Sequence, residues 1–393
     1  MGTLTAELDN GETITYRDKK RWLWLQSVFY PLFPLLAVIP HALTGSELWL
    51  ALPFFYGYVF TPIMDHLLGE DTSNPPAAVV PQLERDKYYR ILTYITVPLH
   101  FVSLIVAAWW AATQDVSALG FVALAFTAGL ASGVGINTGH ELGHKKTRLE
   151  RNLAKIVLAV PAYGHFWIEH NGGHHRDVST PEDPASARMG ESIYRFALRE
   201  IPGAMRRAWQ LETDRLARRG RSAWHPDNAI LQSLAITLVL QGGLIVALGW
   251  SMLIFLAIHN VVAWWQLTSA NYIEHYGLLR QKLENGRYER CQPYHSWNSN
   301  HVYSNLLLFH LERHSDHHAF PARRYQSLRH FDDLPNLPNG YFGMYLIAYI
   351  PALWFRVMDQ RLLDLPHIQG DLSKVNIDPK HRARIEARYG EVG

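Results

Sequence analysis

The sequence predicts an all-α, polytopic membrane protein: a helical bundle of six transmembrane helices with a His-rich helical cap on the cytoplasmic side. Three observations predict this. Of the 393 residues only 18% are charged, against about 25% in an average soluble domain, and 48% are hydrophobic. The apolar residues are concentrated in three long stretches without Lys or Arg, residues 22–84, 91–144 and 222–279. Histidine is frequent, with 21 residues.

Each of these stretches is long enough for two helical crossings of about 20 residues. Short polar or glycine-containing breaks divide them into three hairpins, at residues 22–67, 91–137 and 229–270. We expect one integral-membrane domain over residues 1–393, with a cap of residues 138–228 and 271–393 and no cleaved signal peptide. The six expected spans are Leu23–Leu43, Leu48–Leu67, Ile91–Thr113, Ala118–Asn137, Ala229–Ala247 and Ser251–Ala270.

The basic residues predict the orientation of these spans. With six spans, the loops that carry Lys and Arg all fall on one side, and the three opposite turns carry none. The positive-inside rule therefore places both termini and the large loops in the cytoplasm. The residues that decide this are Arg17, Lys19, Lys20, Arg21, Arg85, Lys87, Arg90, Lys145, Lys146, Arg148 and Arg151.

Three further segments flank the spans. Leu153–Trp167 and Tyr341–Met358 are apolar but short and interrupted by proline, so we expect them to lie at the interface or to re-enter rather than to cross. The Arg-rich segment 188–221 is either a helix against anionic headgroups or a solvated basic helix.

Charge and cysteine content exclude several classes of protein. The net charge of +2 is too small to indicate nucleic-acid binding. The single cysteine, Cys291, excludes a disulfide scaffold and any four-Cys site within these residues. A rubredoxin or ferredoxin centre needs about four thiolates, so the chain as given holds neither.

Nine histidines cluster in four places, all on the predicted cytoplasmic side. Residues three or four apart on a helix share one face, and the clustered histidines have this spacing. Neutral imidazole is a good ligand for iron, zinc, copper or nickel. Four such clusters at one membrane depth predict a metal site formed by His140, His144, His170, His174, His175, His275, His314, His317 and His318.

Nine imidazoles are too many for one metal ion, since a catalytic zinc takes three ligands from protein. Two six-coordinate ions sharing eight or nine imidazoles would leave positions open for oxygen. We expect His165, His295, His301 and His310 to support the site or to pack beside it. Carboxylates beside the clusters are candidate acceptors for the distal ring N–H groups, or else cap helices and pair with arginine; they are Glu141, Glu169, Glu274 and Asp316.

Four motifs give the chain a family resemblance. HELGHK (140–145), EHNGGHH (169–175), NYIEHYG (271–277) and LERHSDHHA (311–319) together resemble the integral-membrane alkane 1-monooxygenases, a branch of the membrane fatty-acid desaturase/hydroxylase superfamily. The likeness covers nearly the whole chain. Three His boxes are general to the superfamily, whereas NYIEHYG and the HSDHH form indicate the alkane hydroxylase branch. Glu312 departs from the usual Gln at a position that is not a ligand.

The resemblance implies a function in some detail. It implies two iron ions in a non-haem di-iron site held by the nine histidines, and terminal hydroxylation of medium- to long-chain n-alkanes with O₂. It implies electrons from a rubredoxin that an NAD(P)H-dependent reductase reduces. It further implies a bacterial inner (cytoplasmic) membrane protein, in contact with lipid and without a nucleic-acid partner.

Such a reaction needs a route for the alkane and a docking surface for the donor. Because a methyl C–H bond offers no charge to bind, we expect the alkane to enter end-on between the spans. Candidate channel residues, which could equally face lipid or pack, are Phe54, Phe55, Tyr56, Tyr58 and Phe60. An acidic donor would be steered by basic residues; candidates, which could instead contact headgroups, are Arg313, Arg323, Arg324 and Arg329.

Several other functions share part of this pattern. His140-Glu-Leu-Gly-His144 also matches the HExxH pattern of zinc proteases, with Glu141 as the base, but the other three clusters have no role there. A carboxylate-bridged di-iron bundle is disfavoured because it needs paired Glu-x-x-His motifs, and only Glu141-Leu-Gly-His144 fits here. A metal transporter would place its ligands near mid-membrane, whereas the His clusters here fall at the predicted cytoplasmic ends of the spans. A membrane fatty-acyl desaturase, or a hydroxylase of another apolar substrate such as an aromatic methyl group, cannot be separated by the His boxes alone.

Overall fold

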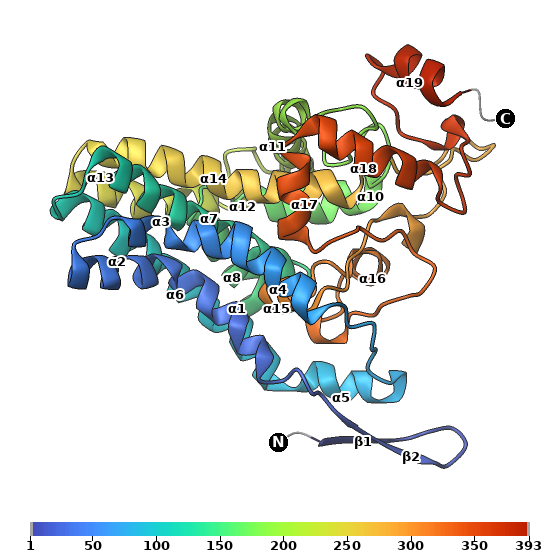
Figure 1. Ribbon diagram of the computed structural model, residues 1–393, viewed down its shortest axis with the longest axis horizontal. Helices are drawn as coiled ribbons and strands as arrows, with labels where there is room; N and C mark the ends of the chain where they lie inside the picture. The colour runs from blue at the N-terminus through green and yellow to red at the C-terminus, as the bar shows by residue number, and fades with distance from the viewer. Residues whose placement is uncertain (1–2, 391–393) are drawn as a thin grey trace.

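The computed structural model describes residues 3–390, and this part of the chain is mainly helical, with one short β-hairpin and several long loops. Figure 1 shows the elements in chain order. The strands are β1 (Thr3–Glu7) and β2 (Thr13–Arg17). The helices are α1 (Gln26–Phe29), α2 (Phe33–Thr44), α3 (Leu48–Phe55), α4 (Thr61–Leu68), α5 (Val80–Arg85), α6 (Lys87–Thr113), α7 (Ala118–Gly143), α8 (Arg148–Ala159), α9 (Phe166–Glu169), α10 (His175–Asp177), α11 (Ile193–Ala217), α12 (Ala229–Thr237), α13 (Gly243–Leu248), α14 (Ser251–Glu274), α15 (Val302–Leu307), α16 (His314–Ala319), α17 (Tyr341–Ala348), α18 (Pro351–Leu363) and α19 (Arg382–Tyr389).

Helices long and apolar enough to cross a membrane confirm the predicted fold class. Among residues 3–390 there are five: Leu23–Thr44, Lys87–Thr113, Ala118–Gly143, Ala229–Leu248 and Ser251–Glu274. Each coincides with one of the six predicted spans. The remaining one, Leu48–Leu67, is a helical run of α3, the π-helical turn η3 (Tyr56–Phe60) and α4, in which Thr61, Asp65 and His66 lower the hydropathy. That it crosses remains a prediction.

Side-chain caps and glycines set the ends of the spans. Asp86 accepts a hydrogen bond from the Tyr88 amide at the start of α6, and Ser117 accepts one from the Gly120 amide at the start of α7. Asn228 caps α12 in the same way. These caps satisfy amides that would otherwise lack partners in the first helical turn.

Helices α7 and α14 pack closely along their lengths and form the centre of the bundle. Gly129 and Gly133 of α7 lie one turn apart and face Val262 and Gln266 of α14. A Cβ at Gly133 would lie 2.5 Å from Cγ of Gln266, so the absence of a side chain permits this approach. Small residues four apart are a common means of close helix packing in membranes. The histidine-bearing ends of both helices are thereby held side by side.

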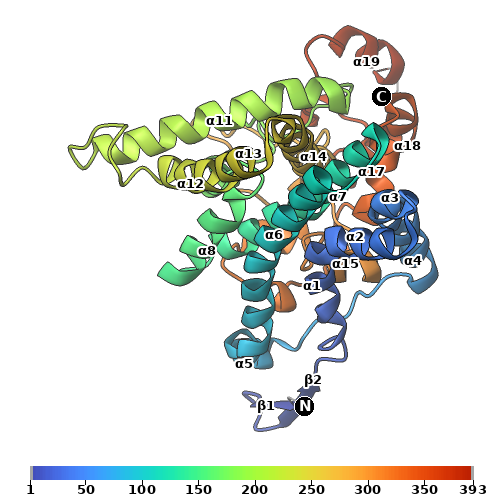
Figure 2. The ribbon, with the colours of Figure 1, turned by 90° about the vertical axis from the view of Figure 1, so that its left-hand side faces the viewer.

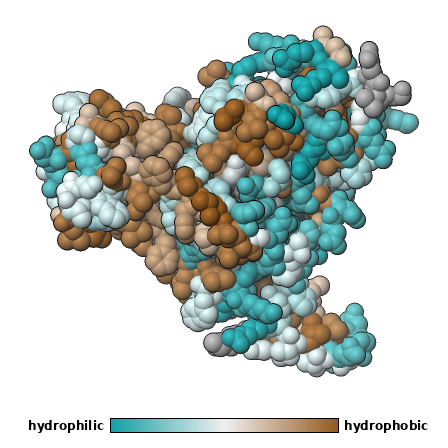
Figure 3. Space-filling view, viewed as in Figure 1, coloured by the Kyte–Doolittle hydropathy of each residue, from teal (hydrophilic) through white to brown (hydrophobic). Residues whose placement is uncertain are grey.

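The molecule has an apolar end and a polar end. In Figure 1 the ends of the spans near α2, α3 and α13 lie at the left, the cap helices α10 and α16 lie toward the right, and α11 lies near the middle at the top. Figure 2 shows α11 and α12 running alongside each other with α8 beneath them. On the face drawn in Figure 3, apolar residues gather over the left-hand end and hydrophilic residues over the right. The loops of the cap lie beyond the polar ends of the spans.

The two ambiguous apolar segments are both interrupted. Helices α17 and α18 meet at an angle of 118°, so together they do not form a straight span. Segment 153–167 leaves α8 at Ala159, turns at Ala162, which has a positive φ of 55°, and enters α9. That these segments lie at the interface or re-enter stays a prediction, since a bent pair of this kind is either a broken span or a re-entrant loop.

The antiparallel hairpin of β1 and β2 was not part of the predicted all-α fold. Its alternating exposed and half-buried residues, such as Thr13, Ile14 and Thr15, have the period of two that is typical of a strand. The turn carries Asn10-Gly11, and Gly11 has a φ of +81°. The side chain of Gln82 donates to the Thr5 carbonyl at 2.6 Å and joins the hairpin to α5.

Candidate metal centre

The C-terminal end of α7 supplies the first two imidazoles. His140 and His144 lie one turn apart, and their ring centroids are 5.0 Å apart. His140 is buried, and α7 ends beside it at Gly143. The predicted pairing of these two histidines is therefore present at the polar end of a span.

A π-helical turn arranges the second cluster differently from the predicted i, i+4 pairing. Residues His170–His174 form the turn η5, which is followed at once by α10. A π-turn holds more residues per turn than an α-helix, so residues five apart share a face. His170 and His175 accordingly approach with their Nε2 atoms 3.1 Å apart, while His174 points to a different group.

Gly173 lets an arginine lie against this turn. A Cβ at Gly173 would lie 2.5 Å from Nε of Arg207 in α11. The Arg207 guanidinium forms ion pairs with Glu169 and with Asp183, the latter at 2.6 Å. Glycine at position 173 of the second His box therefore leaves room for Arg207 of α11, which holds the π-turn through these ion pairs.

The remaining imidazoles come from the end of α14 and from α16. His275 directly follows α14 and is fully buried. His314 and His318 lie four apart in α16 with their Nε2 atoms 3.0 Å apart, whereas His317 faces the first two clusters. The histidines of the last predicted cluster, His314, His317 and His318, are therefore divided between two groups.

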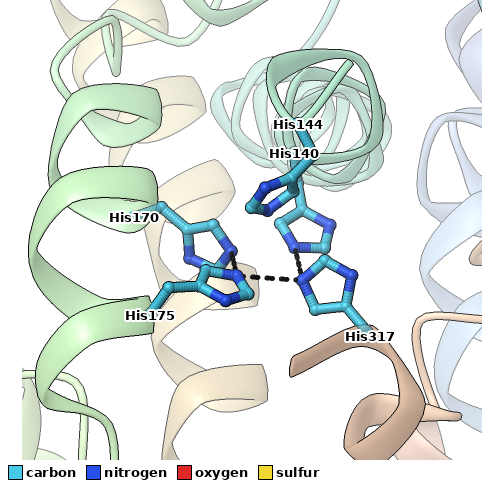
Figure 4. A group of neighbouring side chains, drawn as sticks. All are labelled: His140, His144, His170, His175 and His317. Atoms are coloured by element: carbon cyan, nitrogen blue, oxygen red, sulfur yellow. Dashed lines mark hydrogen bonds between the residues drawn. The ribbon is translucent and has the colours of Figure 1, made fainter. Parts of the chain in front are cut away.

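The structure brings all nine predicted histidines together in two groups. In each group, ring nitrogens lie within 4.8 Å of one another. Figure 4 shows five rings from three parts of the chain pointing toward one another. The first group is His140, His144, His170, His175 and His317, and the second is His174, His275, His314 and His318.

The spacing of the ring nitrogens fits metal ligation. Nε2 of His317 lies 3.0 Å from that of His140 and 3.1 Å from that of His175 (dashed in Figure 4). In the second group, Nε2 of His314 lies 3.1 Å from that of His275. Two nitrogens bound at right angles to one ion, each at about 2.1 Å, would lie about 3.0 Å apart. One ion per group fits this spacing.

Burial keeps most of these imidazoles in the form that binds metals. It lowers the pKa of His144 and His170 well below the usual value, and neighbouring imidazoles lower it further. The pKa values of His175, His314, His317 and His318 are lowered for the same two reasons. Neutral imidazole is the metal-binding form.

Two distal ring nitrogens have partners that orient the ring. Nδ1 of His275 lies 3.0 Å from the backbone carbonyl of His295. Nδ1 of His174 lies 2.9 Å from Oδ2 of Asp183, which is fully buried. Each contact places the N–H on Nδ1 and leaves the Nε2 lone pair facing the group. His174 differs from the other clustered histidines because, although burial opposes it, Asp183 raises its pKa.

Asp183 was missed by sequence reasoning. It lies in the segment Pro181-Glu182-Asp183-Pro184, eight residues beyond the second His box, where no histidine spacing points to it. Its carboxylate also accepts a hydrogen bond from the Ser186 hydroxyl at 2.6 Å. Only the folded turn shows that Asp183 reaches back to His174.

Three of the four predicted carboxylates make contacts other than the expected one to a distal imidazole N–H. Glu141 pairs with Lys145 at 3.0 Å. Glu169 pairs with Arg207. Asp316 accepts from Arg323 at 2.5 Å and also from Arg329. These contacts correspond to the other reading of these residues, pairing with a cation.

Glu274 does reach the centre, although on the inner side. Its Oε2 lies 3.4 Å from Nε2 of His314, the nitrogen that faces the second group. Its Oε1 is buried and has no hydrogen-bond partner among the described residues. The carboxylate therefore faces the space between the imidazoles and the adjoining cavity.

An apolar cavity runs from the imidazoles between α7 and α14. His140, His170 and His314 line its polar end together with Glu274. Gln266 lies eight residues before Glu274, so the cavity extends about 12 Å along α14. Its other walls are Gly133, Val134, Asn137, Phe166, Leu267, Ala270, Asn271, Leu308, Leu311, Phe342 and Tyr345.

The predicted channel aromatics do not line this cavity. Phe54, Phe55 and Phe60 are exposed on the outer surface of α3 and η3. Tyr56 packs against Phe33, and Tyr58 is buried and bonds to Gln266 at the end of the cavity. A run of aromatics does not show which helix face turns inward, and that these residues contact the substrate stays a prediction. The cavity lining comes instead from α7, α14 and the segments around Phe166, Leu308 and Phe342.

The four predicted docking arginines are engaged within the protein. Arg313 is buried and donates to the carbonyls of Leu328 and Asp71, each at 2.7 Å, which contradicts a surface role for it. Arg323 and Arg329 hold Asp316, and Arg324 pairs with buried Glu150 at 2.7 Å. These arginines lie near the last His box because they support it from within the protein.

The other nearby histidines lie outside both groups. His310 is buried, and its Nδ1 lies 3.0 Å from the Tyr325 carbonyl. His165 packs edge-on against Tyr163, and Nδ1 of His301 lies 2.8 Å from the Ser299 hydroxyl. With His295 supporting His275 through its carbonyl, all four act as expected, in packing or support.

Comparisons with known proteins agree with this geometry. A family model for fatty acid desaturases matches residues 116–349. The chain is 56% identical to alkane 1-monooxygenase 1 of Alcanivorax borkumensis over 379 residues, which is 96% of this chain and 93% of that protein. It is also 56% identical to alkane 1-monooxygenase of Ectopseudomonas oleovorans, over 95% of this chain and 93% of that protein. The hydroxylase component of xylene/toluene monooxygenase of Pseudomonas putida is 30% identical over 56% of this chain and 58% of its own length.

Proposed function

The chain belongs to the fatty acid desaturase family and, within it, to the alkane 1-monooxygenases, and from this premise we propose that it hydroxylates the terminal carbon of medium- to long-chain n-alkanes. One observation carries the proposal. An apolar cavity between two spans ends at two convergent groups of imidazoles. The cavity suits a substrate without polar groups, and the imidazoles suit redox-active metal ions.

The proposed cofactor is a non-haem di-iron pair, one ion in each group. The five and four imidazoles leave positions open on six-coordinate ions, as O₂ chemistry requires. Imidazole suits iron, and the absence of cysteine from both groups disfavours a structural zinc site. Asp183 and the His295 carbonyl would hold His174 and His275 in the ligating orientation.

The proposed reaction converts R–CH₃, O₂, two electrons and two protons into R–CH₂OH and H₂O. Bound irons would supply the activation of O₂. The protein supplies position, because an alkane lying along α14 would present only its end to His140, His170 and His314. Apolar walls such as Leu308 and Phe342 would hold the chain by contact area and exclude water.

The two electrons would come from a rubredoxin reduced by an NAD(P)H-dependent reductase. The 393 residues contain one cysteine, so they do not hold a four-thiolate centre of their own. We place the protein in the bacterial inner membrane with both termini and the metal centre on the cytoplasmic side. The basic residues that flank the spans support this orientation.

A membrane assay tests the function directly. Membranes containing the chain are supplied with rubredoxin, reductase, NAD(P)H and a set of n-alkanes, and the products are separated by gas chromatography. We expect 1-alkanols, and none from His275→Ala membranes that contain the same amount of inserted protein. Olefinic lipid without alkanol would overturn the proposal in favour of a desaturase.

A second substrate class deserves a parallel measurement. The partial likeness to a xylene/toluene monooxygenase component makes an aromatic methyl group the other substrate to test. Competition between toluene and an n-alkane in the same membranes compares the two. We expect the alkane to be preferred because the chain is 56% identical to alkane 1-monooxygenases over nearly its whole length, against 30% over 56% of its length to the xylene/toluene component.

The zinc protease alternative finds no support in the geometry. A protease of the HExxH type needs Glu141 beside the metal-bound water. The Glu141 carboxylate instead pairs with Lys145 and accepts from the Tyr325 amide.

A metal transporter also finds no support. Its ligands would lie at mid-membrane, whereas the imidazoles here lie at the helix ends.

A further inference from the structure

A basic groove lies away from the metal centre, between α8, α11 and the start of α12. It is a hollow of about 680 Å³. In Figure 2 the helices that carry its lining residues lie next to one another, with α8 below α12 and α11 above. Six cationic side chains and two acidic ones line it; the cationic ones are Arg148, Arg151, Lys155, Arg215, Arg218 and Arg219.

The positive charge of the groove is poorly neutralised by the protein. The two acids are already engaged, since Glu212 pairs with Arg215 at 2.6 Å and Asp227 pairs with Arg221 outside the lining. No carboxylate within residues 3–390 pairs with the other four arginines, which are exposed: Arg148, Arg151, Arg218 and Arg219.

The field of these arginines acts on a lysine inside the groove. Burial lowers the pKa of Lys155, and Arg151 and Arg148 lower it further, against the opposing effect of Glu212. Lys155 donates to the amide oxygen of Gln232 at 2.9 Å rather than to a carboxylate. Four uncompensated cations facing one hollow favour an anionic ligand.

The position of the groove indicates where that ligand comes from. Ala229 and Gln232 line it, and Ala229 is the first residue of a candidate span. Leu234 and Leu238 are exposed further along the same helix. The hollow therefore lies at the polar end of a span, with apolar surface leading from it along the helix.

The walls of the groove are amphipathic as well as basic. Trp167, Ile168 and Leu211 line it beside the arginines. Trp224, in the connection between α11 and α12, is 74% exposed. Exposed tryptophan at the end of a span is typical of the membrane–water interface. A soluble acidic protein would have no use for this apolar continuation.

We propose that the groove between α8, α11 and α12 binds the phosphate headgroup of an anionic phospholipid, whose acyl chains lie along the exposed apolar face of α12. Basic pockets beside transmembrane helices commonly bind such headgroups. The arginines would contact the phosphate oxygens as charge-assisted donors. The site is independent of the proposed hydroxylation and takes no part in the metal centre.

Native mass spectrometry of the delipidated protein in neutral detergent tests the site, with phosphatidylglycerol and phosphatidylcholine as probes. We expect phosphatidylglycerol to bind at least about tenfold more tightly. The groove variant should lose this preference; it carries Arg148→Gln, Arg151→Gln, Arg218→Gln and Arg219→Gln. A control that removes as many exposed arginines elsewhere should keep it; it carries Arg206→Gln, Arg287→Gln, Arg356→Gln and Arg361→Gln.

Two results would overturn the proposal. The first is an unchanged preference for phosphatidylglycerol in the groove variant. The second is a groove variant that binds lipid as before but has a several-fold higher KM for an acidic electron donor. That result would make the groove a protein-docking surface. If the fourfold variant does not elute as a monodisperse species, the double variant Arg151→Gln/Arg218→Gln is measured instead. It should bind phosphatidylglycerol more weakly than the unchanged protein does and bind phosphatidylcholine equally well.

Discussion

Nδ1 of His174 lies 2.9 Å from Oδ2 of Asp183, and both side chains are buried. Asp183 also accepts from Arg207, whose guanidinium lies against Gly173 in the π-turn. The second His box is thus fixed from outside by a carboxylate and an arginine that come from other parts of the chain.

Asp183→Ala should weaken metal binding without removing a ligand. The change frees Nδ1 of His174 and leaves Arg207 with one fewer carboxylate, so we expect metal affinity to fall about 10- to 100-fold. Chelator competition on the purified protein measures this. Asp332→Ala, at a side chain that is 96% exposed, is the control. Equal affinity in the two variants would contradict the role given to Asp183.

Gly173→Ala should disturb the centre through crowding. The new Cβ would lie 2.5 Å from Nε of Arg207, so either the π-turn or the guanidinium must move. We expect lower metal occupancy and a lower thermal midpoint. Gly172→Ala is the matched control, because its Cβ would meet only Leu211, at 3.4 Å. If both variants behave alike, the clamp by Arg207 is unimportant.

Gln266→Ala should lengthen the apolar cavity. Gln266 lies at the end far from the imidazoles and bonds to Tyr58, so truncation adds space where the far end of an alkane would lie. We expect the distribution of 1-alkanols to shift toward longer chains. Gln241→Ala changes another half-buried span glutamine, one that bonds to Val160 and Asn260 away from the cavity. A shift of the same size in that control would remove the cavity from the substrate route.

Glu200 should make stability depend on pH. Burial raises its pKa to about 7, although Thr268 and Asn271 donate to it. The folded state then binds a proton that the unfolded state releases near pH 4.5, so stability falls as pH rises from about 4.5 to 7, by about 3 kcal/mol. Thermal inactivation in detergent across this window should show the decline, and Glu200→Gln should flatten it. An unchanged slope in Glu200→Gln would assign the dependence to another group.

The sequence predicted the parts of this protein that have a periodic or compositional signal. Apolar length gave the spans, and histidine spacing gave the nine residues that the fold brings together. It could not predict that the π-turn pairs His170 with His175, because helical spacing in a sequence is read at the α-helical period. The role of Asp183 also had no signal, since its partner is reached only through a folded turn.

Which side chains are exposed and which are buried was the hardest property to predict from the sequence alone. Phe54 and Phe55 face outward, whereas Phe342 and Leu308, which were not among the predicted channel residues, line the cavity. Arg313 is a buried donor to backbone carbonyls although arginine beside a functional site suggests a docking surface. Which face of a helix turns inward is decided by packing between helices distant in sequence.

The central claim is that nine imidazoles in two groups hold a pair of iron ions, and the iron content of the purified protein tests it most directly. We expect about two irons per chain in the native protein, with Mössbauer parameters of nitrogen-rich sites. His275→Ala should lower the content, whereas His310→Ala, at a buried histidine outside both groups, should keep it. One redox-silent zinc per chain, or full iron content in His275→Ala, would contradict the account.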